Sequence, residues 1–206
     1  MVERGADRSP PTVPLRIEGE LRLLLEHVAR EPLLGVAARA DALGLSRRKM
    51  DALKRTLVEE GYLRPVDLPI PQGRTVLLEL TDAARFWLAQ HRVPGSPVNG
   101  SLPHAWWQAR VAEMLREKGW SVEVEKRIGG HAFDVWAERD RRTLLLEIET
   151  GRSDWLANIA KLEAEHADVR AVLWLDQASL PRARSSLPAR IELLTPRTLD
   201  AESLGS

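Results

Sequence analysis

The chain has 206 residues, of which 44% are hydrophobic and 29% charged, and its 30 Lys and Arg balance its 30 Asp and Glu. This is an ordinary globular composition, and because no apolar run approaches the ~20 residues that span a bilayer, it excludes a membrane-spanning protein. The absence of cysteine excludes disulfides, thiolate nucleophiles and zinc fingers, so any metal must be held by carboxylates or histidines. The first 14 residues lack an apolar signal-peptide core, and we therefore expect a cytoplasmic protein without a membrane partner.

Proline and glycine divide the chain into two predicted domains. Residues 1–14 carry three prolines among polar and small residues, which is typical of a flexible arm. The segment RVPGSPVNGSLP contains three more prolines and two glycines. We therefore expect one domain at 15–92 and a second at 104–200, with a linker at 93–103 and a short tail at 201–206.

Apolar residues at helical spacing predict three helices in the first domain. The first contains Leu21, Leu24, Leu25 and Val28, and a short second helix covers about 34–43. The third begins after Ser46, because Gly44 stops the preceding helix and serine is a good N-cap. The basic side chains of this helix are expected to face outward, because its predicted buried stripe is apolar. The stripe consists of Met50, Leu53, Leu57 and Val58.

After Gly61 the apolar pattern changes to that of strands. YLRPV and TVLLEL are predicted to pair as a two-stranded wing around the loop DLPIPQGR at 67–74. The segment LTDAARFWLAQH follows as a closing helix that Thr81 caps.

The segments GLSRRKMDALKRTLVEEGYL and LELTDAARFWL resemble the MarR-like winged helix family over residues 20–92. In that family the third helix enters the major groove and the wing touches the DNA backbone. The residues give the same expectation, because first-turn side chains of a recognition helix reach base edges while Arg and Lys neutralise phosphates. The alternative is a module for protein docking or dimerisation, in which these residues form a solvated face. The predicted DNA-binding residues are Arg47, Arg48, Lys49, Lys54, Arg55 and Arg74.

The second domain is predicted to be an α/β sandwich with a mixed sheet. The pattern gives a helix, three strands, a helix and two strands. The run VRAVLWL is apolar except for Arg170, as expected of a strand covered on both faces. These predicted elements lie at 104–118, 120–125, 132–138, 143–150, 154–166, 169–175 and 190–195. Ser153 is the expected N-cap of the helix at 154–166.

Three carboxylates are predicted to meet on the central hairpin of this sheet. Because side chains alternate along a strand, Glu147 and Glu149 share one face. A turn centred on Asp140 and Arg141 pairs 136 with 145 and places Asp134 opposite Glu147. Opposed like charges destabilise a sheet by about 0.2 to 1 kcal/mol, and a divalent cation would reverse the sign of that interaction. We therefore predict a Mg²⁺ or Mn²⁺ site for phosphodiester chemistry, with these three acids as its ligands.

The order of elements, with Asp134 on the second strand and E-I-E on the third, is similar to the restriction-endonuclease-like PD-(D/E)XK nucleases. In that family the aspartate and the first glutamate bind Mg²⁺, which implies Asp134 and Glu147. The usual lysine is replaced by Glu149, which is then a third ligand or a base that orients water. Other members move the lysine to the following helix, where Lys161 is the candidate transition-state cation.

The stretch EIETGRSDWLANIAKLE also looks like nuclease-like domains of plasmid replication-relaxation proteins and of proteins beside conjugation-type HerA/FtsK ATPases. These combine a winged helix with an H…D…ExD/E-T-G…K pattern. By position, the resemblance adds His104, Thr150 and Gly151 to the predicted site and again implies Lys161.

Each assignment has a plainer alternative. The acids are also compatible with a solvent-facing sheet surface, His104 with the end of the apolar helix stripe that contains Trp107, and Lys161 with an ion pair to Glu165. Glu113 on the same helix as His104 points away from the sheet and is not a candidate.

The sequence therefore predicts a DNA-binding protein in which a winged helix positions a Mg²⁺-dependent nuclease-like domain, possible settings being a mobile element, replication or defence. The alternative is a non-catalytic regulator or adaptor whose degenerate nuclease-like domain binds DNA or a partner ATPase or helicase. Because the net charge is zero, DNA binding is expected to be modest and salt-sensitive, strengthened by a homodimer or by the second domain.

Overall fold

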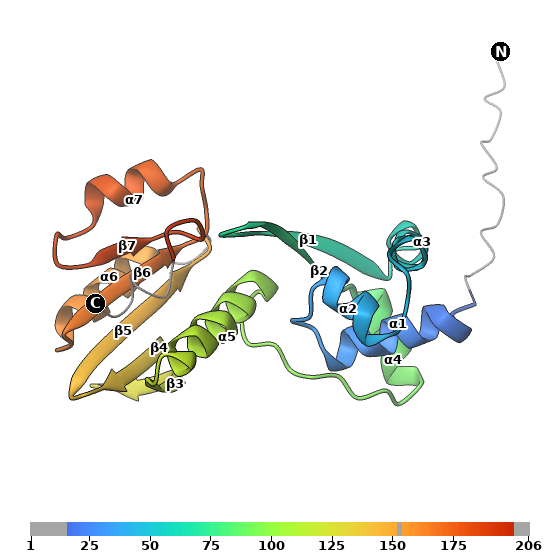
Figure 1. The fold of residues 1–206 in the computed structure, drawn as a ribbon, viewed down its shortest axis with the longest axis horizontal. Coiled ribbons are helices and arrows are strands. Elements are labelled where there is room, and N and C mark those ends of the chain that lie inside the picture. Colours follow the sequence, from blue (N-terminus) through green and yellow to red (C-terminus); the bar gives the residue numbers. More distant parts are fainter. Residues whose placement is uncertain (1–15, 152–153, 200–206) are drawn as a thin grey trace, which may run out of the picture.

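The computed structural model describes residues 16–151 and 154–199, so the predicted arm at 1–14 and tail at 201–206 lie outside the described residues. Within that part the chain has a mixed α/β fold of seven helices and seven strands. A five-stranded sheet lies at one end and a helical group at the other (Figure 1). No helix of the described part is long and apolar enough to cross a membrane.

The N-terminal half has the order of elements predicted from the sequence. They are α1 (Gly19–Arg30), α2 (Val36–Ala42), α3 (Arg47–Glu59), β1 (Leu63–Ile70), β2 (Gly73–Leu80) and α4 (Asp82–Gln90). Helix α3 begins directly after Ser46, whose Oγ accepts a hydrogen bond from the backbone N–H of Lys49 at 3.3 Å. Thr81 caps α4 in the same way through Ala84 N, again at 3.3 Å. Both predicted N-caps are confirmed.

A buried arginine ties α1 to α2. The Arg39 side chain is 0% exposed, and its guanidinium donates hydrogen bonds to the carbonyl oxygens of Glu31 at 2.6 Å and Leu34 at 2.8 Å. It also lies 2.8 Å from Nδ1 of His27. A guanidinium only donates, so His27 must accept here and be neutral. Burial and the Arg39 charge both lower the pKa of His27, which favours that neutral form.

The predicted loop at 67–74 is wrong, because most of it belongs to a longer hairpin. Strands β1 and β2 pair along their whole length, from Leu63↔Leu80 to Ile70↔Gly73. Pro65 and Pro69 do not interrupt this pairing. Residues four apart direct their backbone nitrogens to the same edge of a strand, and here that edge is the one that faces away from β2, so the missing N–H groups cost no hydrogen bond.

The hairpin extends from the helical group to the sheet (Figure 1). Leu68 and Leu77 from its two strands are buried with Leu102, and Ile70 at its tip packs against the core of the C-terminal half. The hairpin therefore connects the two halves of the chain through apolar contacts.

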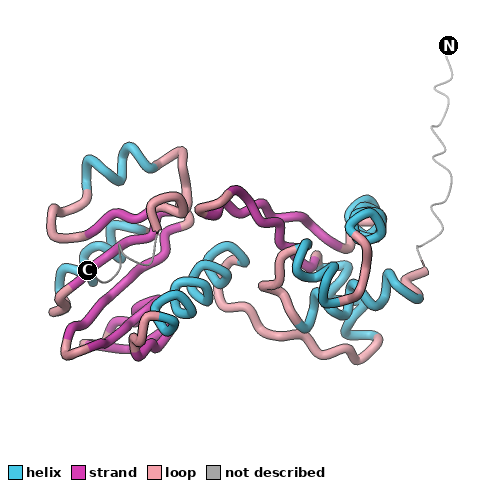
Figure 2. Tube along the Cα trace, in the orientation of Figure 1, coloured by secondary structure: helices cyan, strands magenta, loops and turns pink. Residues whose placement is uncertain are grey.

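The C-terminal half is a five-stranded mixed sheet between helices. Strand order is β3-β4-β5-β6-β7, with antiparallel pairing from β3 to β5 and parallel pairing from β5 to β7. Figure 2 shows the strands running together between flanking helices. The elements are α5 (Leu102–Glu117), β3 (Ser121–Ile128), β4 (His131–Arg139), β5 (Arg142–Glu149), α6 (Trp155–Ala164), β6 (Val169–Trp174), α7 (Leu180–Ser186) and β7 (Glu192–Leu194).

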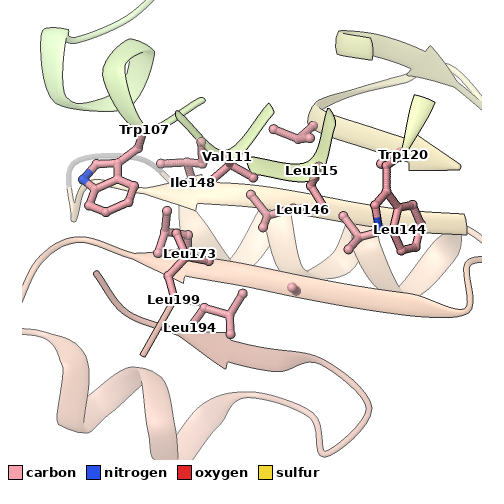
Figure 3. Packing of buried hydrophobic residues seen from close by; sticks show 13 residues of the cluster. Trp107, Val111, Leu115, Trp120, Leu144, Leu146, Ile148, Leu173, Leu194 and Leu199 are labelled. Carbon is pink, nitrogen blue, oxygen red and sulfur yellow. The ribbon is translucent and has the colours of Figure 1, made fainter. Parts of the chain in front are cut away.

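Each face of this sheet has its own core. Trp107, Val111 and Leu115 of α5 pack on one face against Leu144, Leu146 and Ile148 of β5 (Figure 3). Helices α6 and α7 pack on the other face in a separate cluster that contains Ile159, Leu162 and Ala183. Because both faces are covered, β6 is apolar and buried from Ala171 to Trp174, as predicted for most of the run VRAVLWL.

Three helices of the C-terminal half differ from the sequence prediction. Helix α7 was not expected, and α5 begins at Leu102 rather than at His104, because Ser101 caps it and Pro103 is accommodated in the first turn. Asp154, not Ser153, caps α6 through Ala157 N. Ser153 itself lies outside the described residues.

Candidate functional site

The β4–β5 hairpin brings Asp134 next to Glu147. Asp140 and Arg141 both have positive φ, 52° and 64°, as in the two-residue turns that favour tight hairpins. The register pairs Trp136 with Leu145, as predicted, and the ladder ends one step later at Val135↔Leu146. Beyond it, side chains replace the backbone bonds. The N–H of Asp134 donates to Glu147 Oε1 at 3.4 Å, and the N–H of Ile148 donates to Asp134 Oδ2 at 2.7 Å.

Glu147 and Glu149 lie on the face of β5 that α6 covers, as the alternation along the strand predicts. The side chain of Glu147 is 1% exposed, and its Oε2 lies 2.7 Å from Lys161 Nζ. The same Nζ donates to the carbonyl oxygen of Ala132 at 2.6 Å. Glu149 is fully buried and accepts a hydrogen bond from Asn158 Nδ2 at 2.6 Å. Helix α6 therefore supplies one polar partner for each acid.

The carboxyl group of Glu147 has a strongly perturbed pKa. Burial raises it from the ordinary 4.5 to about 8, the negative charge of Asp134 acts in the same direction, and Lys161 opposes both. A carboxyl group that holds its proton near neutral pH, in contact with a second acid and a lysine, is characteristic of reactive and ligand-binding sites.

His104 reaches the site from the first turns of α5. Its Nε2 lies 3.1 Å from Asp134 Oδ2, and this hydrogen bond raises the pKa of His104 although burial lowers it. His104 therefore contacts the acid as well as continuing the apolar stripe of its helix. The structure thus brings together His104, Asp134, Glu147 and Lys161 in one connected group.

Asp134 does not follow the simple alternation assumed from the sequence. Trp136 packs in the α6-side cluster and Val135 in the α5-side cluster, yet Phe133 also packs on the α6 side, so the alternation is interrupted at Asp134. Its carboxylate is thereby able to contact His104 on one side of the sheet while its backbone contacts Glu147, which lies on the other.

Three further polar residues surround the site and were missed by the sequence reasoning. Gln108 donates from Nε2 to Glu125 Oε1 at 2.8 Å and to the carbonyl oxygen of Asp134 at 3.0 Å. The third is Asn158, the partner of Glu149. Gln108 is one helical turn from His104, and Asn158 is one turn from Lys161, so helical spacing was an available signal for both. Glu125 offered none, because its role depends on a backbone angle.

The remaining positions implied by the resemblance lie at the end of β5. Thr150 is half-buried, and Gly151 has φ +78°. A Cβ at Gly151 would lie 2.7 Å from Cβ of Asp176, so glycine is required there by both its backbone angle and its neighbour.

The donor set suits a hard divalent cation in part. Asp134 and Glu147 are two carboxylates whose repulsion contributes to the raised pKa of Glu147, and Mg²⁺ commonly uses one or two carboxylates together with water and phosphate oxygens. Glu149 is hydrogen-bonded to Asn158, and no group of three or more His, Asp or Glu among the described residues is arranged to hold a metal. The structure therefore fits a two-carboxylate site better than the three-acid site expected from the sequence.

The six predicted DNA-binding residues separate into two groups. The lysines are paired with acids: Lys49 Nζ lies 2.6 Å from Glu20, and Lys54 Nζ lies 2.8 Å from Asp51. The arginines are exposed and make no hydrogen bond or ion pair with any other described residue. These arginines are Arg47, Arg48, Arg55 and Arg74. Arg47 and Arg74 line one hollow between α2, α3 and β2, together with Lys54.

Comparison with known proteins gives only distant likenesses. No family model and no curated protein sequence matches the chain. Among solved structures, protein VC1899 from Vibrio cholerae is 17% identical, with a TM-score of 0.35, and the match covers 90% of this chain and 53% of that one. Can2 from Sulfobacillus thermosulfidooxidans, solved with cyclic tetra-adenylate, is 14% identical, with a TM-score of 0.37, and the match covers 84% and 46%. The chain thus spans about half the length of each, and TM-scores this low do not establish a shared fold.

Proposed function

We propose that the chain is a DNA-binding protein whose C-terminal half is a PD-(D/E)XK-like phosphodiesterase. The observation that carries the proposal is the contact between Asp134, the buried Glu147 and Lys161 at the end of the β4–β5 ladder. A purely structural sheet gains nothing from a buried glutamate whose pKa is raised to about 8, since burying an acid is costly.

The proposed chemistry assigns a role to each residue of the connected group. Asp134 and Glu147 would hold Mg²⁺ or Mn²⁺, which when bound supplies a Lewis acid for the phosphate and lowers the pKa of a bound water. Lys161 would lower the pKa of Glu147 against the effect of burial, and would offset charge that develops on the phosphate. His104 would hold a proton at Nε2, beside Asp134, for transfer to the leaving oxygen.

The N-terminal half is proposed to be a winged helix that delivers DNA to this site. Helix α3 presents Arg47 and Arg48 in its first turn, where side chains of a recognition helix reach base edges. Arg74 on β2 lies on the same side of the molecule, at the hollow it shares with Arg47. These exposed arginines suit phosphate, because none of them forms an ion pair with an acid of the described part.

Arginines and lysines of this surface are expected to contribute unequally to DNA binding. Arg47→Ala together with Arg74→Ala should weaken duplex binding at least about tenfold and reduce the salt dependence by about two phosphate contacts. The matched double variant, Lys49→Ala with Lys54→Ala, should change binding about threefold or less, because both lysines already have acidic partners. Fluorescence anisotropy at several salt concentrations measures both. Equal losses in the two variants would contradict the assignment.

The proposed activity is tested by incubating the whole chain with labelled single-stranded, double-stranded and branched DNA. Cleavage should appear with Mg²⁺ or Mn²⁺, and stop when EDTA is added. Absence of cleavage on all three substrates with both metals would overturn the enzymatic proposal.

A second candidate function is a non-catalytic regulator or adaptor. It is favoured by the observation that Lys161 and Glu149 already have protein partners. Lys161 contacts the carboxylate of Glu147 and the carbonyl oxygen of Ala132, and Glu149 accepts a hydrogen bond from the amide of Asn158. In that case the C-terminal half would bind DNA or a partner such as an ATPase or helicase. Duplex binding without metal binding or cleavage would favour this candidate.

A further inference from the structure

We propose that Gln108 on α5 and Glu125 on β3 are positioning residues for the carboxylate of Asp134. The contacts are independent of any activity. The proposal rests on the proposed function only in the consequence that a displaced Asp134 slows hydrolysis.

The first observation is a gap in the pairing of β3 with β4. The register pairs Val124 with Val135 and Lys126 with Phe133, and it leaves out Glu125 and Asp134 between them. Because one residue is unpaired on each strand, the gap is not a β-bulge, in which one strand carries an extra residue. Glu125 and Asp134 leave the ladder together. Glu125 has φ +53°, in the left-handed region that side chains other than glycine rarely adopt. Such backbone angles persist only where surrounding contacts hold them.

The second observation is the side chain that bridges the gap. Gln108 is 7% exposed, and its Nε2 donates one hydrogen bond to Glu125 Oε1 and one to the carbonyl oxygen of Asp134. An amide nitrogen has two donor hydrogens, and both are used. Glu125 therefore fixes the orientation of the Gln108 amide, and Gln108 in turn holds the backbone of Asp134.

The third observation is that Asp134 is held by side chains on both sides. Gln108 binds its carbonyl oxygen, and Glu147 accepts from its N–H. Freed from the ladder, Asp134 directs Oδ2 to the N–H of Ile148 and to Nε2 of His104. Ladder pairing with Glu125 would instead restore the alternation that is interrupted at Asp134 and withdraw this carboxylate from His104.

Hydrogen exchange at the amide of Ile148 tests the proposal directly, because that amide donates to Asp134 Oδ2. In Gln108→Leu and in Glu125→Ala, the exchange of Ile148 should become about tenfold faster, while the Leu144 and Leu146 amides of the same strand keep their wild-type rates. Glu125→Gln retains an oxygen that accepts from Gln108 and should keep Ile148 at the wild-type rate. Glu123→Ala is the matched control, since Glu123 is an exposed acid of β3 that pairs with Lys126.

Two outcomes would overturn the positioning role: wild-type exchange at Ile148 in both Gln108→Leu and Glu125→Ala, or exchange in Glu125→Gln as fast as in Glu125→Ala. Where the wild type cleaves DNA, Glu125→Ala should also lower kcat about tenfold at unchanged KM, because the arginines of α3 are untouched. Unchanged kcat would count against the role. If the wild type cleaves nothing, the proposed function fails and the exchange rates still decide the positioning.

Discussion

Replacing Asp134 with asparagine is expected to abolish DNA cleavage, reducing the rate at least about a thousandfold. The substitution removes one of the two charges proposed to hold the metal, and it removes the charged partner of His104. The fold should survive, because the amide oxygen of asparagine can still accept the hydrogen bond from Ile148 N. Single-turnover cleavage of a labelled DNA, with circular dichroism to confirm folding, measures the effect.

The matched control is Glu113→Gln, which removes an exposed acid of α5 whose partner is Arg110. Its cleavage rate and its affinity for duplex DNA should equal those of the wild type, and Asp134→Asn should also keep wild-type DNA affinity. Cleavage by Asp134→Asn within tenfold of the wild-type rate would show that the phosphodiesterase site lies elsewhere.

Replacing Lys161 with methionine is expected to produce the largest loss of stability, about 3 to 5 kcal/mol at pH 9, because it leaves a buried carboxylate without its cation. The size of the loss should depend on pH. Glu147 has a folded-state pKa raised to about 8 from 4.5, so its favourable contribution is complete below pH 4.5 and is lost as the pH rises through about 8. Without Lys161 this pKa rises further, so the loss caused by the substitution should be equal at pH 5 and pH 7 and should grow only above pH 8, by about 1.4 kcal/mol per pH unit.

Urea unfolding at pH 5, 7 and 9 measures these free energies. Adding Glu147→Gln to Lys161→Met should recover most of the loss at pH 9, since the buried charge is then gone. The comparison variant is Arg190→Met, which breaks an exposed ion pair with Glu163 and should cost less than about 1 kcal/mol. A loss in Lys161→Met that does not change between pH 5 and pH 9 would contradict an ionised, buried partner.

Much of the fold follows from local sequence signals. Serine and threonine are favoured N-caps, so Ser46 and Thr81 predicted the starts of α3 and α4, and the structure confirms both. The central hairpin was predictable because its turn at Asp140 and Arg141 fixes the register, and the side-chain period of two then places Glu147 and Glu149 on one face.

What the sequence did not show depends on contacts between distant segments. The hairpin continues through 67–70 because Leu68 is buried against Leu77 and Leu102, a contact across the two halves that no local pattern reports. The break in alternation at Asp134 comes from Glu125 on the neighbouring strand β3, together with Gln108 on α5. Strand geometry alone predicted a three-acid site that included Glu149. In the structure Glu149 instead accepts a hydrogen bond from Asn158, and this contact depends on how α6 packs on the sheet.

The most direct test of the two-carboxylate site is calorimetric titration of the whole chain with Mg²⁺ and with Mn²⁺ at pH 7.5. We expect one divalent ion bound per chain in the wild type and in Glu113→Gln, and none in Asp134→Asn. Absence of divalent-ion binding by the wild type, or binding that Asp134→Asn leaves unchanged, would contradict it.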